Sequence, residues 1–257
     1  MDEISAKISF SKTVIILFSV LTTCLFAQHS DQPTITWYGH SCFLITTSQN
    51  TKILTDPVDK WNCCIPKDCI PDVVTVSHNH ADHNAVKAVS GKPKLIFGID
   101  KNGRQPFQKF VQADENVKDV KIYNVSSNHF PPKHSPALNS IFIFEFDGIR
   151  IAHLGDIGLV MTEAQVKKIG PIDILMIPVG GEYTVSLAEV DKIIMQLRPR
   201  MAVIPMHYKT DTIHFLPHSV DDFIRGKDNI ERIAGNTYRI DLTNRGESMK
   251  YIILNIK

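Results

Sequence analysis

The chain has 257 residues, of which 43% are hydrophobic and 21% charged, so it can build one substantial core. Its 28 basic and 27 acidic side chains leave a net charge of +1 at pH 7. This balance, without any basic tract, creates no field that would draw nucleic acid or an acidic membrane to the surface. It argues against a nuclease that grips a long polyanion, and we expect no nucleic-acid partner.

The amino-terminal segment has a composition of its own. Lys7 and Lys12 precede an apolar run at 14–26, which ends beside a small residue. This order is typical of a secretory signal peptide. We therefore predict that residues 1–27 are removed and that residues 28–257 form a single domain, periplasmic or secreted. The run is short for a membrane span, so no stable span is expected after cleavage; an uncleaved amino-terminal anchor is the alternative.

Strands are predicted to dominate the early chain. Alternation over 34–46 indicates a hairpin, and short apolar runs at 52–55 and 72–76 indicate two further strands. Cys42 lies in the hairpin and is expected in the core.

The loop between the last two of these strands contains Cys63, Cys64 and Cys69. In an oxidising compartment Cys69 would be able to pair with either of the other two. We favour a local disulfide or free thiols over a metal site, because a fourth ligand is missing nearby.

Helices alternate with strands in the later chain. Thr162 and Ser186 are good N-caps, and each precedes an amphipathic stretch. The expected helices are 84–90, 103–114, 163–169 and 187–197, and the expected strands are 94–97, 120–125, 140–146, 149–154, 172–177, 201–205, 237–242 and 249–256. This arrangement is typical of an α/β protein with two sheets sandwiched by helices.

A dense group of ligand-type side chains follows the strand at 72–76. The spacing is His-x-His-x-Asp-His, with His78, His80, Asp82 and His83 inside six residues. On an extended backbone His78 and His80 point the same way, and the other two lie on the turn beyond the strand. A closed structural zinc site usually uses cysteines, so this group favours a catalytic metal site.

Other ligand-type residues also stand where predicted strands end. They are Asp56, His129, Asp156 and His207. In layered α/β folds the loops beyond strand ends are where functional sites assemble. A lone histidine at one such place is usually structural, but several together with the dense group predict a metal centre.

At this point the sequence resembles the metallo-β-lactamase superfamily, and within it the branch of ascorbate-6-phosphate lactonase-like proteins and related metal-dependent hydrolases. Besides the His-x-His-x-Asp-His group, the matching segments are Gly-His-Ser-Cys-Phe at 39–43, Leu-Thr-Asp-Pro at 54–57, His-Leu-Gly-Asp at 153–156 and Ile-Pro-Met-His-Tyr at 204–208. The resemblance implies an αββα four-layer sandwich with a two-metal site between the sheets.

The resemblance also implies which residues hold the two metals, expected to be Zn²⁺ with manganese or iron as alternatives. The first metal would be held by His78, His80 and His129, the second by Asp82, His83 and His207, and both by a bridging Asp156.

Three assignments beside this set stay open or secondary. His129 competes with His134 as a ligand and is preferred because it directly follows a strand. His153 would point away from Asp156 in an alternating strand, so it is read as supporting the site and not as a ligand. Asp56 is expected to orient a ligand histidine.

The expected activity is hydrolysis of a small-molecule ester or lactone by a metal-bridged hydroxide. Asp82 and Asp156 are the expected catalytic residues, with Asp82 as proton acceptor. His40, Tyr183 and Tyr208 are candidates for contacting the substrate or stabilising the oxyanion, with a supporting structural role as the alternative. A phosphodiesterase or an iron-dependent oxidoreductase of the same fold are the alternatives. The sequence does not predict the oligomeric state.

Overall fold

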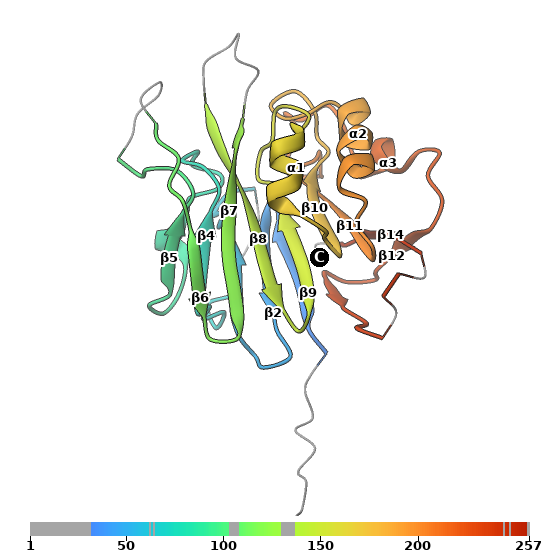
Figure 1. Cartoon of the computed structure of the whole chain (residues 1–257). Helices are drawn as coiled ribbons and strands as arrows, with labels where there is room; N and C mark the ends of the chain where they lie inside the picture. Colours follow the sequence, from blue (N-terminus) through green and yellow to red (C-terminus); the bar gives the residue numbers. More distant parts are fainter. Residues whose placement is uncertain are drawn as a thin grey trace, which may run out of the picture.

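Two β-sheets facing each other form the centre of the computed structural model (Figure 1). The structure describes residues 32–255, except residues 62, 64, 103–107, 130–136, 244 and 247. The predicted segment 1–27 therefore lies outside the described residues. Among the described residues, no helix has the length and apolar character to cross a bilayer.

The first sheet has six strands in the order β13-β1-β2-β3-β4-β5. In chain order these are β1 (Thr34–Gly39), β2 (Cys42–Thr46), β3 (Lys52–Thr55), β4 (Val73–Val76), β5 (Lys94–Phe97) and β13 (Thr237–Arg239). The predicted hairpin over 34–46 is present as the antiparallel pair β1–β2. From β3 to β5 the strands run parallel.

The second sheet has eight strands in the order β12-β14-β11-β10-β9-β8-β7-β6. They are β6 (Asp114–Val117), β7 (Val120–Asn128), β8 (Leu138–Phe146), β9 (Ile149–His153), β10 (Ile174–Pro178), β11 (Ala202–Met206), β12 (Ile230–Arg232) and β14 (Lys250–Ile253). The half from β9 to β12 is parallel, so its carboxyl ends meet at one edge.

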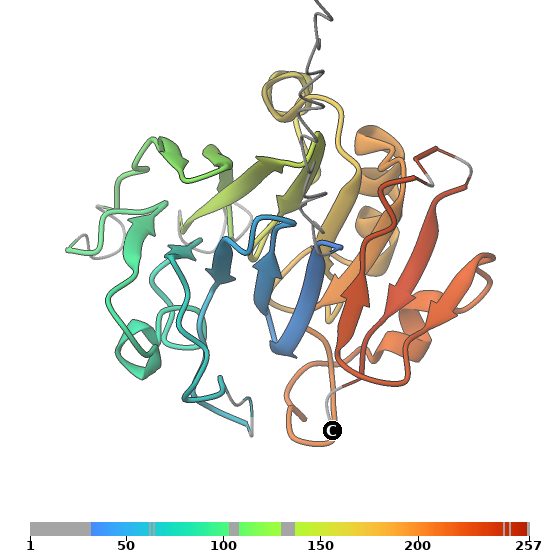
Figure 2. The ribbon, with the colours of Figure 1, turned by 90° about the horizontal axis from the view of Figure 1, so that it is seen from below.

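Helices cover the outer face of the eight-stranded sheet (Figures 1 and 2). They are α1 (Glu163–Ile169), which contacts β7, and α2 (Leu187–Leu197), which contacts β10. Thr162 caps α1 as predicted, by accepting a hydrogen bond from the backbone of Gln165. A short α3 (Val220–Ile224) was not predicted. The mixed fold confirms the predicted metallo-β-lactamase fold class.

The helical layer outside the six-stranded sheet is thin. Among the described residues it holds only the 3-10 turn η1 (Val86–Ala88), within the predicted helix at 84–90. The predicted helix at 103–114 is wrong for residues 108–114, while 103–107 lie outside the described residues. The side chain of Asn124 is the reason: its amide donates to Val111 O at 2.8 Å and its carbonyl accepts from Ala113 N at 2.7 Å. These backbone groups are thereby used outside a helix, and the chain continues into β6.

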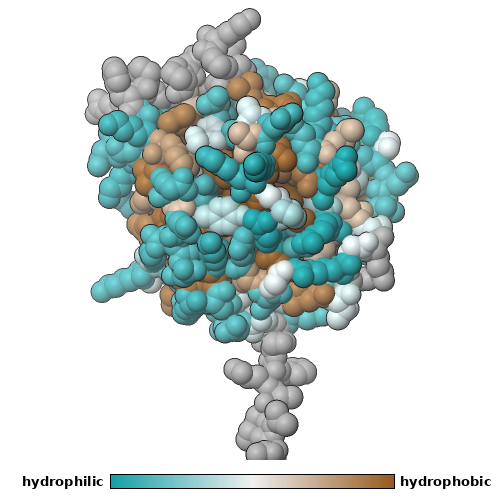
Figure 3. All heavy atoms as spheres, viewed as in Figure 1, coloured by the Kyte–Doolittle hydropathy of each residue, from teal (hydrophilic) through white to brown (hydrophobic). Residues whose placement is uncertain are grey.

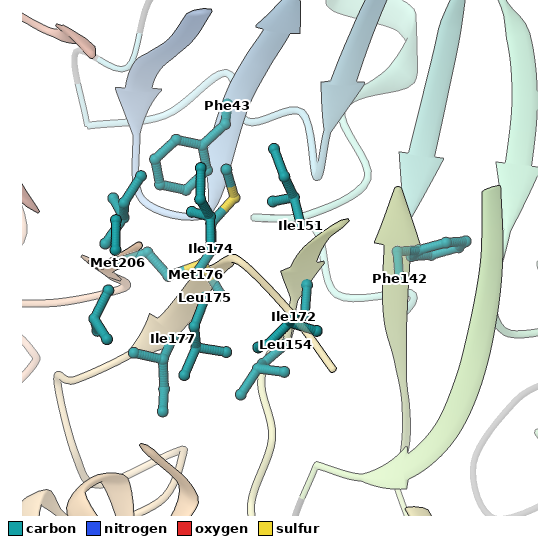
Figure 4. Close-up of a cluster of buried hydrophobic side chains, with 14 of the residues drawn as sticks. Phe43, Phe142, Ile151, Leu154, Ile172, Ile174, Leu175, Met176, Ile177 and Met206 are labelled. Atoms are coloured by element: carbon teal, nitrogen blue, oxygen red, sulfur yellow. The ribbon is translucent and has the colours of Figure 1, made fainter. Parts of the chain in front are cut away.

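The main hydrophobic core lies between the two sheets (Figure 4). Phe43 enters it from the six-stranded sheet, and Ile151, Met176 and Met206 enter it from the other. All four side chains are fully buried. On the face that Figure 3 shows, by contrast, hydrophilic residues are spread among small hydrophobic areas.

Truncating Phe43 is expected to destabilise the fold. Phe43→Ala removes a fully buried ring at the junction of the sheets, and such a change costs about 3–5 kcal/mol of unfolding free energy. Urea unfolding followed by circular dichroism measures it. Leu95→Ala, at a side chain that is 43% exposed on β5, should stay within about 0.5 kcal/mol of the parent. A similar loss in both variants would mean that Phe43 has no special place in the core.

Candidate metal centre

The dense group of ligand-type residues is placed by β4, whose four residues are all buried. Directly after it, the backbone N–H of Ser77 donates to Asp56 Oδ1 at 2.7 Å. Asp56 directly follows the neighbouring strand β3, so one carboxylate ties the two strand ends together. The turn that follows is closed by a hydrogen bond from His83 N to His80 O at 3.0 Å.

Three imidazoles form a first cluster. They come from His78 and His80 after β4 and from His129 after β7, and their nitrogen atoms lie within 4.8 Å of one another. His78 and His129 are buried and His80 is half-buried. The two sheets therefore both contribute to this cluster, as predicted. His134 lies outside the described residues.

A second cluster lies next to the first. Asp82, His83, His207 and His40 each bring one ligand-type atom within 4.8 Å of the others. His207 follows β11 and His40 follows β1, and the backbone N–H of His207 donates to His40 O at 3.2 Å. The position of His40 inside this cluster was not predicted, because the sequence offered it only as a residue that supports the ligands or contacts the substrate.

The carboxylate of Asp156 stands between the two clusters. Its Oδ2 lies 3.3 Å from His129 Nε2 and 3.8 Å from His78 Nε2 in the first cluster. It lies 3.2 Å from His83 Nε2 and 3.1 Å from His207 Nε2 in the second. One buried oxygen is thus shared by four imidazoles, which is the geometry expected of a bridging ligand.

The donor atoms fit divalent metal ions. His78 Nε2, His83 Nε2 and Asp156 Oδ1 are buried and make no hydrogen bond, an arrangement that is costly without another partner. Imidazole nitrogens with carboxylate oxygens are a ligand set that suits zinc. The residues present therefore fit divalent metal ions.

The electrostatics of the centre favour a bound cation. Burial and the neighbouring His83 ring lower the pKa of His78, and burial lowers that of His80. Burial raises the pKa of Asp156, but the imidazoles of His207 and His83 outweigh it and hold the pKa well below its ordinary value. Neutral imidazoles and ionised carboxylates are the forms that metal ligands require.

The pKa of His83 is shifted in the opposite direction from that of His78 and His80. Burial would lower its pKa, but the carboxylates of Asp156 and Asp56 raise the pKa well above its ordinary value. This part of the centre therefore attracts positive charge, which a metal ion would supply.

Comparison with known proteins agrees with this geometry. The model of the beta-lactamase superfamily domain matches residues 34–207, which is more than half of the chain. This chain belongs to the metallo-β-lactamase superfamily. It is 29% identical over 194 residues to a UPF0173 metal-dependent hydrolase of Methanosarcina barkeri, covering 68% of this chain and 83% of the relative.

Two further similar proteins match a larger part of this chain. A UPF0173 metal-dependent hydrolase of Pyrococcus furiosus is 27% identical over 233 residues, covering 84% of this chain and 98% of the relative. A crystal structure from Thermotoga maritima, provisionally assigned as a Zn-dependent hydrolase of the superfamily, is 36% identical with a TM-score of 0.69. That match covers 88% of this chain and 100% of the other.

In the candidate metal centre, the imidazoles of His83 and His78 are oriented by hydrogen bonds at their Nδ1 atoms. Asp56 Oδ2 lies 2.9 Å from His83 Nδ1, and Ser77 Oγ lies 2.9 Å from His78 Nδ1. Ser77 Oγ in turn donates to Asp56 Oδ2 at 2.5 Å, so it accepts from His78. Both rings then carry their proton on Nδ1, which leaves each Nε2 lone pair facing the centre. Asp56 thus has the orienting contact that the sequence predicted.

Replacing Asp56 is expected to weaken metal binding more than folding. Asp56→Asn keeps the shape but loses the charge that fixes His83, and loss of such a partner typically lowers metal affinity about 10–100-fold. Competition against a chromogenic zinc chelator measures the affinity. Asp59→Asn, at an exposed carboxylate three positions further on, is the matched control and should bind zinc as the parent does. Equal affinities in the two variants would contradict the orienting role of Asp56.

The Asp156 backbone is held in place by Asn139 of β8. Asn139 Oδ1 accepts from Asp156 N at 3.0 Å, and its Nδ2 donates to Leu154 O at 2.8 Å. Between them Gly155 has φ 54°, and a Cβ there would lie 2.3 Å from Asn139 Oδ1 and 2.7 Å from Ser77 Cβ. Only glycine lets this turn pass so close to both side chains.

Backbone strain gathers at the centre. His40, Asp56 and His207 all have positive φ angles, of 52°, 37° and 50°. Side chains other than glycine rarely adopt this conformation. Such residues collect where surrounding structure holds a functional site in one arrangement.

Three other predicted residues lie around the centre. His153 is buried and hydrogen-bonded at both ring nitrogens, with Nε2 2.9 Å from Ser41 O and Nδ1 accepting from Gly155 N at 3.3 Å, which fits a supporting residue. Tyr208 is buried and packs on Trp37 with ring centroids 5.3 Å apart. Tyr183 is 43% exposed, on the loop after β10.

The cysteines show no metal cluster within the described residues. Cys42 is buried, as predicted, and Cys69 is a buried free thiol. The predicted disulfide of Cys69 is therefore not formed here, and for this residue the free-thiol alternative holds. Cys64 lies outside the described residues.

Sequence reasoning missed two kinds of residue. Asn139, within β8, and Ser77, directly after β4, act through hydrogen bonds, and single polar residues at such positions give no distinguishing pattern. Trp61 lies in the cysteine-containing loop, with its ring centroid 5.1 Å from that of His40. That loop has no periodicity from which its direction could be predicted.

Proposed function

We propose that this metal-dependent hydrolase holds two Zn²⁺ ions and cleaves small-molecule esters or lactones. The observation that carries the proposal is the position of Asp156, whose one buried oxygen contacts imidazoles of both clusters. The first ion would be held by His78, His80 and His129, the second by Asp82, His83 and His207, and both by Asp156. When bound, such ions supply a Lewis acid and lower the pKa of water towards neutrality.

Asp82 is the residue best placed to accept a proton from the attacking water. Its side chain is 23% exposed, whereas Asp156 is 2% exposed. Burial raises the pKa of Asp82, but its hydrogen bond with His40 and the nearby His83 outweigh this and keep the carboxyl ionised. His40 Nε2 lies 3.2 Å from Asp82 Oδ2 and holds it in position. Burial and the His207 ring lower the pKa of His40 to about 3, so this partner stays neutral.

Two features of the sequence favour zinc over iron and an uncharged substrate over a polyanion. The residue at the second position of the metal motif is His80, and imidazole nitrogen is one of the ligand types that commonly bind zinc. The net charge of +1 gives no general attraction for polyanions. We also propose that the protein is exported through residues 1–27, which the basic and apolar order of that segment supports.

Metal analysis and a paired substrate assay test the proposal. The purified protein should contain close to two equivalents of zinc, and zinc-loaded protein should hydrolyse lactones or aryl esters but not phosphodiesters. Addition of a chelator should abolish turnover. Turnover of phosphodiesters alone would replace the substrate class, and iron with an absorption band in the visible range would replace the reaction class.

A further inference from the structure

A row of aromatic rings begins beside the second cluster. Trp61 lies with its ring centroid 5.1 Å from that of His40 and 5.1 Å from that of Phe215. Phe215 in turn lies 6.0 Å from Tyr183. We call Trp61, Phe215 and Tyr183 the aromatic wall. Because His40 contacts Asp82 and His207, the wall starts at the candidate metal centre and leads away from it.

The wall is open to solvent at its outer end. Phe215 is 44% and Tyr183 is 43% exposed, and these two are the most exposed of the described phenylalanine, tyrosine and tryptophan side chains. Exposed apolar side chains scattered singly need no explanation, but rings gathered in contact at one place mark a binding surface.

The segments that carry the wall are fixed to one another. Thr212 Oγ1 donates to Trp61 O at 2.6 Å, which ties the loop after β11 to the loop after β3. Figure 2 shows these two loops at the same edge of the molecule. The turn that leads to Tyr183 is pressed against the metal-binding strand end, because a Cβ on Gly180 would lie 2.3 Å from His207 O. The rings are therefore placed in advance of binding.

A cavity of about 780 Å³ adjoins the wall at Trp61. Its charged lining residues include Lys209 and Arg232 but also Asp211 and Asp221, and Arg232 is paired with Asp221. This lining offers room without a net positive charge, so it does not select for a phosphate group.

We propose that the aromatic wall binds an aryl or alkyl group of the substrate and that Trp61 determines this preference. The inference rests on the proposed hydrolase function and adds the substrate class: esters or lactones with a hydrophobic substituent, not small phosphorylated ones. Burying an apolar group against aromatic faces supplies affinity that a bare ester lacks.

Two carboxylates that resemble hydrolysis products test the wall without turnover. Isothermal titration of zinc-loaded protein with 4-phenylbutyrate and with butyrate gives the affinity added by the ring. We expect the phenyl compound to bind at least about tenfold more tightly in the parent protein. In Trp61→Ala this ratio should fall to within about twofold of one, while zinc content stays unchanged.

Further variants guard against a folding defect. Trp61→Phe should keep most of the ratio, and Phe215→Ala, in a different loop, should lower it. Met195→Ala, at a 72% exposed apolar side chain on α2, should leave the ratio unchanged. The proposal is overturned if the ring adds no affinity in the parent protein, or if Trp61→Ala and Phe215→Ala both retain the parent ratio. Because no turnover is measured, a protein that keeps the ratio but hydrolyses no ester would refute the proposed function and not the wall.

Discussion

Asp156→Asn is expected to lower hydrolytic turnover by at least about a thousandfold, because it removes the one charged oxygen that both clusters share. Metal-assisted stabilisation of developing charge contributes several kcal/mol, and each 1.36 kcal/mol corresponds to a tenfold change in rate. Zinc content should fall below two equivalents at the same time. Turnover on the best ester or lactone, together with elemental analysis of the same preparation, measures both effects.

The matched control for this variant is another buried carboxylate. Asp173 is also fully buried, but it is paired with Arg200 at 2.8 Å, in no metal-ligand group of the described residues. Asp173→Asn should lower stability and leave zinc content and turnover per folded molecule unchanged. If Asp156→Asn kept both its zinc and its activity, Asp156 would not be the bridging ligand.

Removal of the metals is expected to lower the melting temperature by about 10 °C. A ligand present at a thousand times its dissociation constant stabilises a fold by about 4 kcal/mol. For a domain of this size each kcal/mol shifts the melting temperature by about 2–4 °C. Without a cation, the buried Nε2 atoms of His78 and His83 make no hydrogen bond that replaces those to water. Differential scanning calorimetry before and after dialysis against a chelator gives the shift.

A ligand variant separates this effect from a general action of the chelator. Asp156→Asn should melt lower than the parent from the start, and chelator treatment should lower its melting temperature by only a few degrees. Restoring zinc to the parent protein should restore its melting temperature. If the parent protein melted at the same temperature with and without metal, metal binding at the two clusters would make no contribution to stability.

Much of the fold could be predicted because the decisive patterns are local. The strand at 52–55 and the helix at 163–169 were predicted with the bounds that the structure has, since a β-branched run and a capping residue act within a few positions. The predicted helix at 103–114 is wrong over its described part, residues 108–114, for the opposite reason. Asn124, on a strand further along the chain, binds the backbone at 111 and 113 and decides its conformation.

The candidate metal centre also contains some residues that the sequence could predict and others that it could not. The spacing of His78, His80 and His83 is visible in the sequence because these residues lie in one short segment directly after β4. The place of His40 depends on how the β1–β2 turn meets the end of β11, and the place of Trp61 depends on a loop without regular structure. Such placements follow from tertiary contacts between distant segments, which a single sequence does not encode as a pattern.

Because β1 pairs with β13, the six-stranded sheet is completed only after residues 237–239 have been synthesised. Every proposed ligand has been synthesised once the chain reaches His207, yet the six-stranded sheet still lacks its outermost strand. Ile35 pairs with Tyr238, and Thr34 with Arg239, across some two hundred residues of chain. A nascent or truncated chain ending after β11 would therefore carry a complete ligand set and an unsatisfied β1 edge, the kind of edge through which chains pair with one another and aggregate.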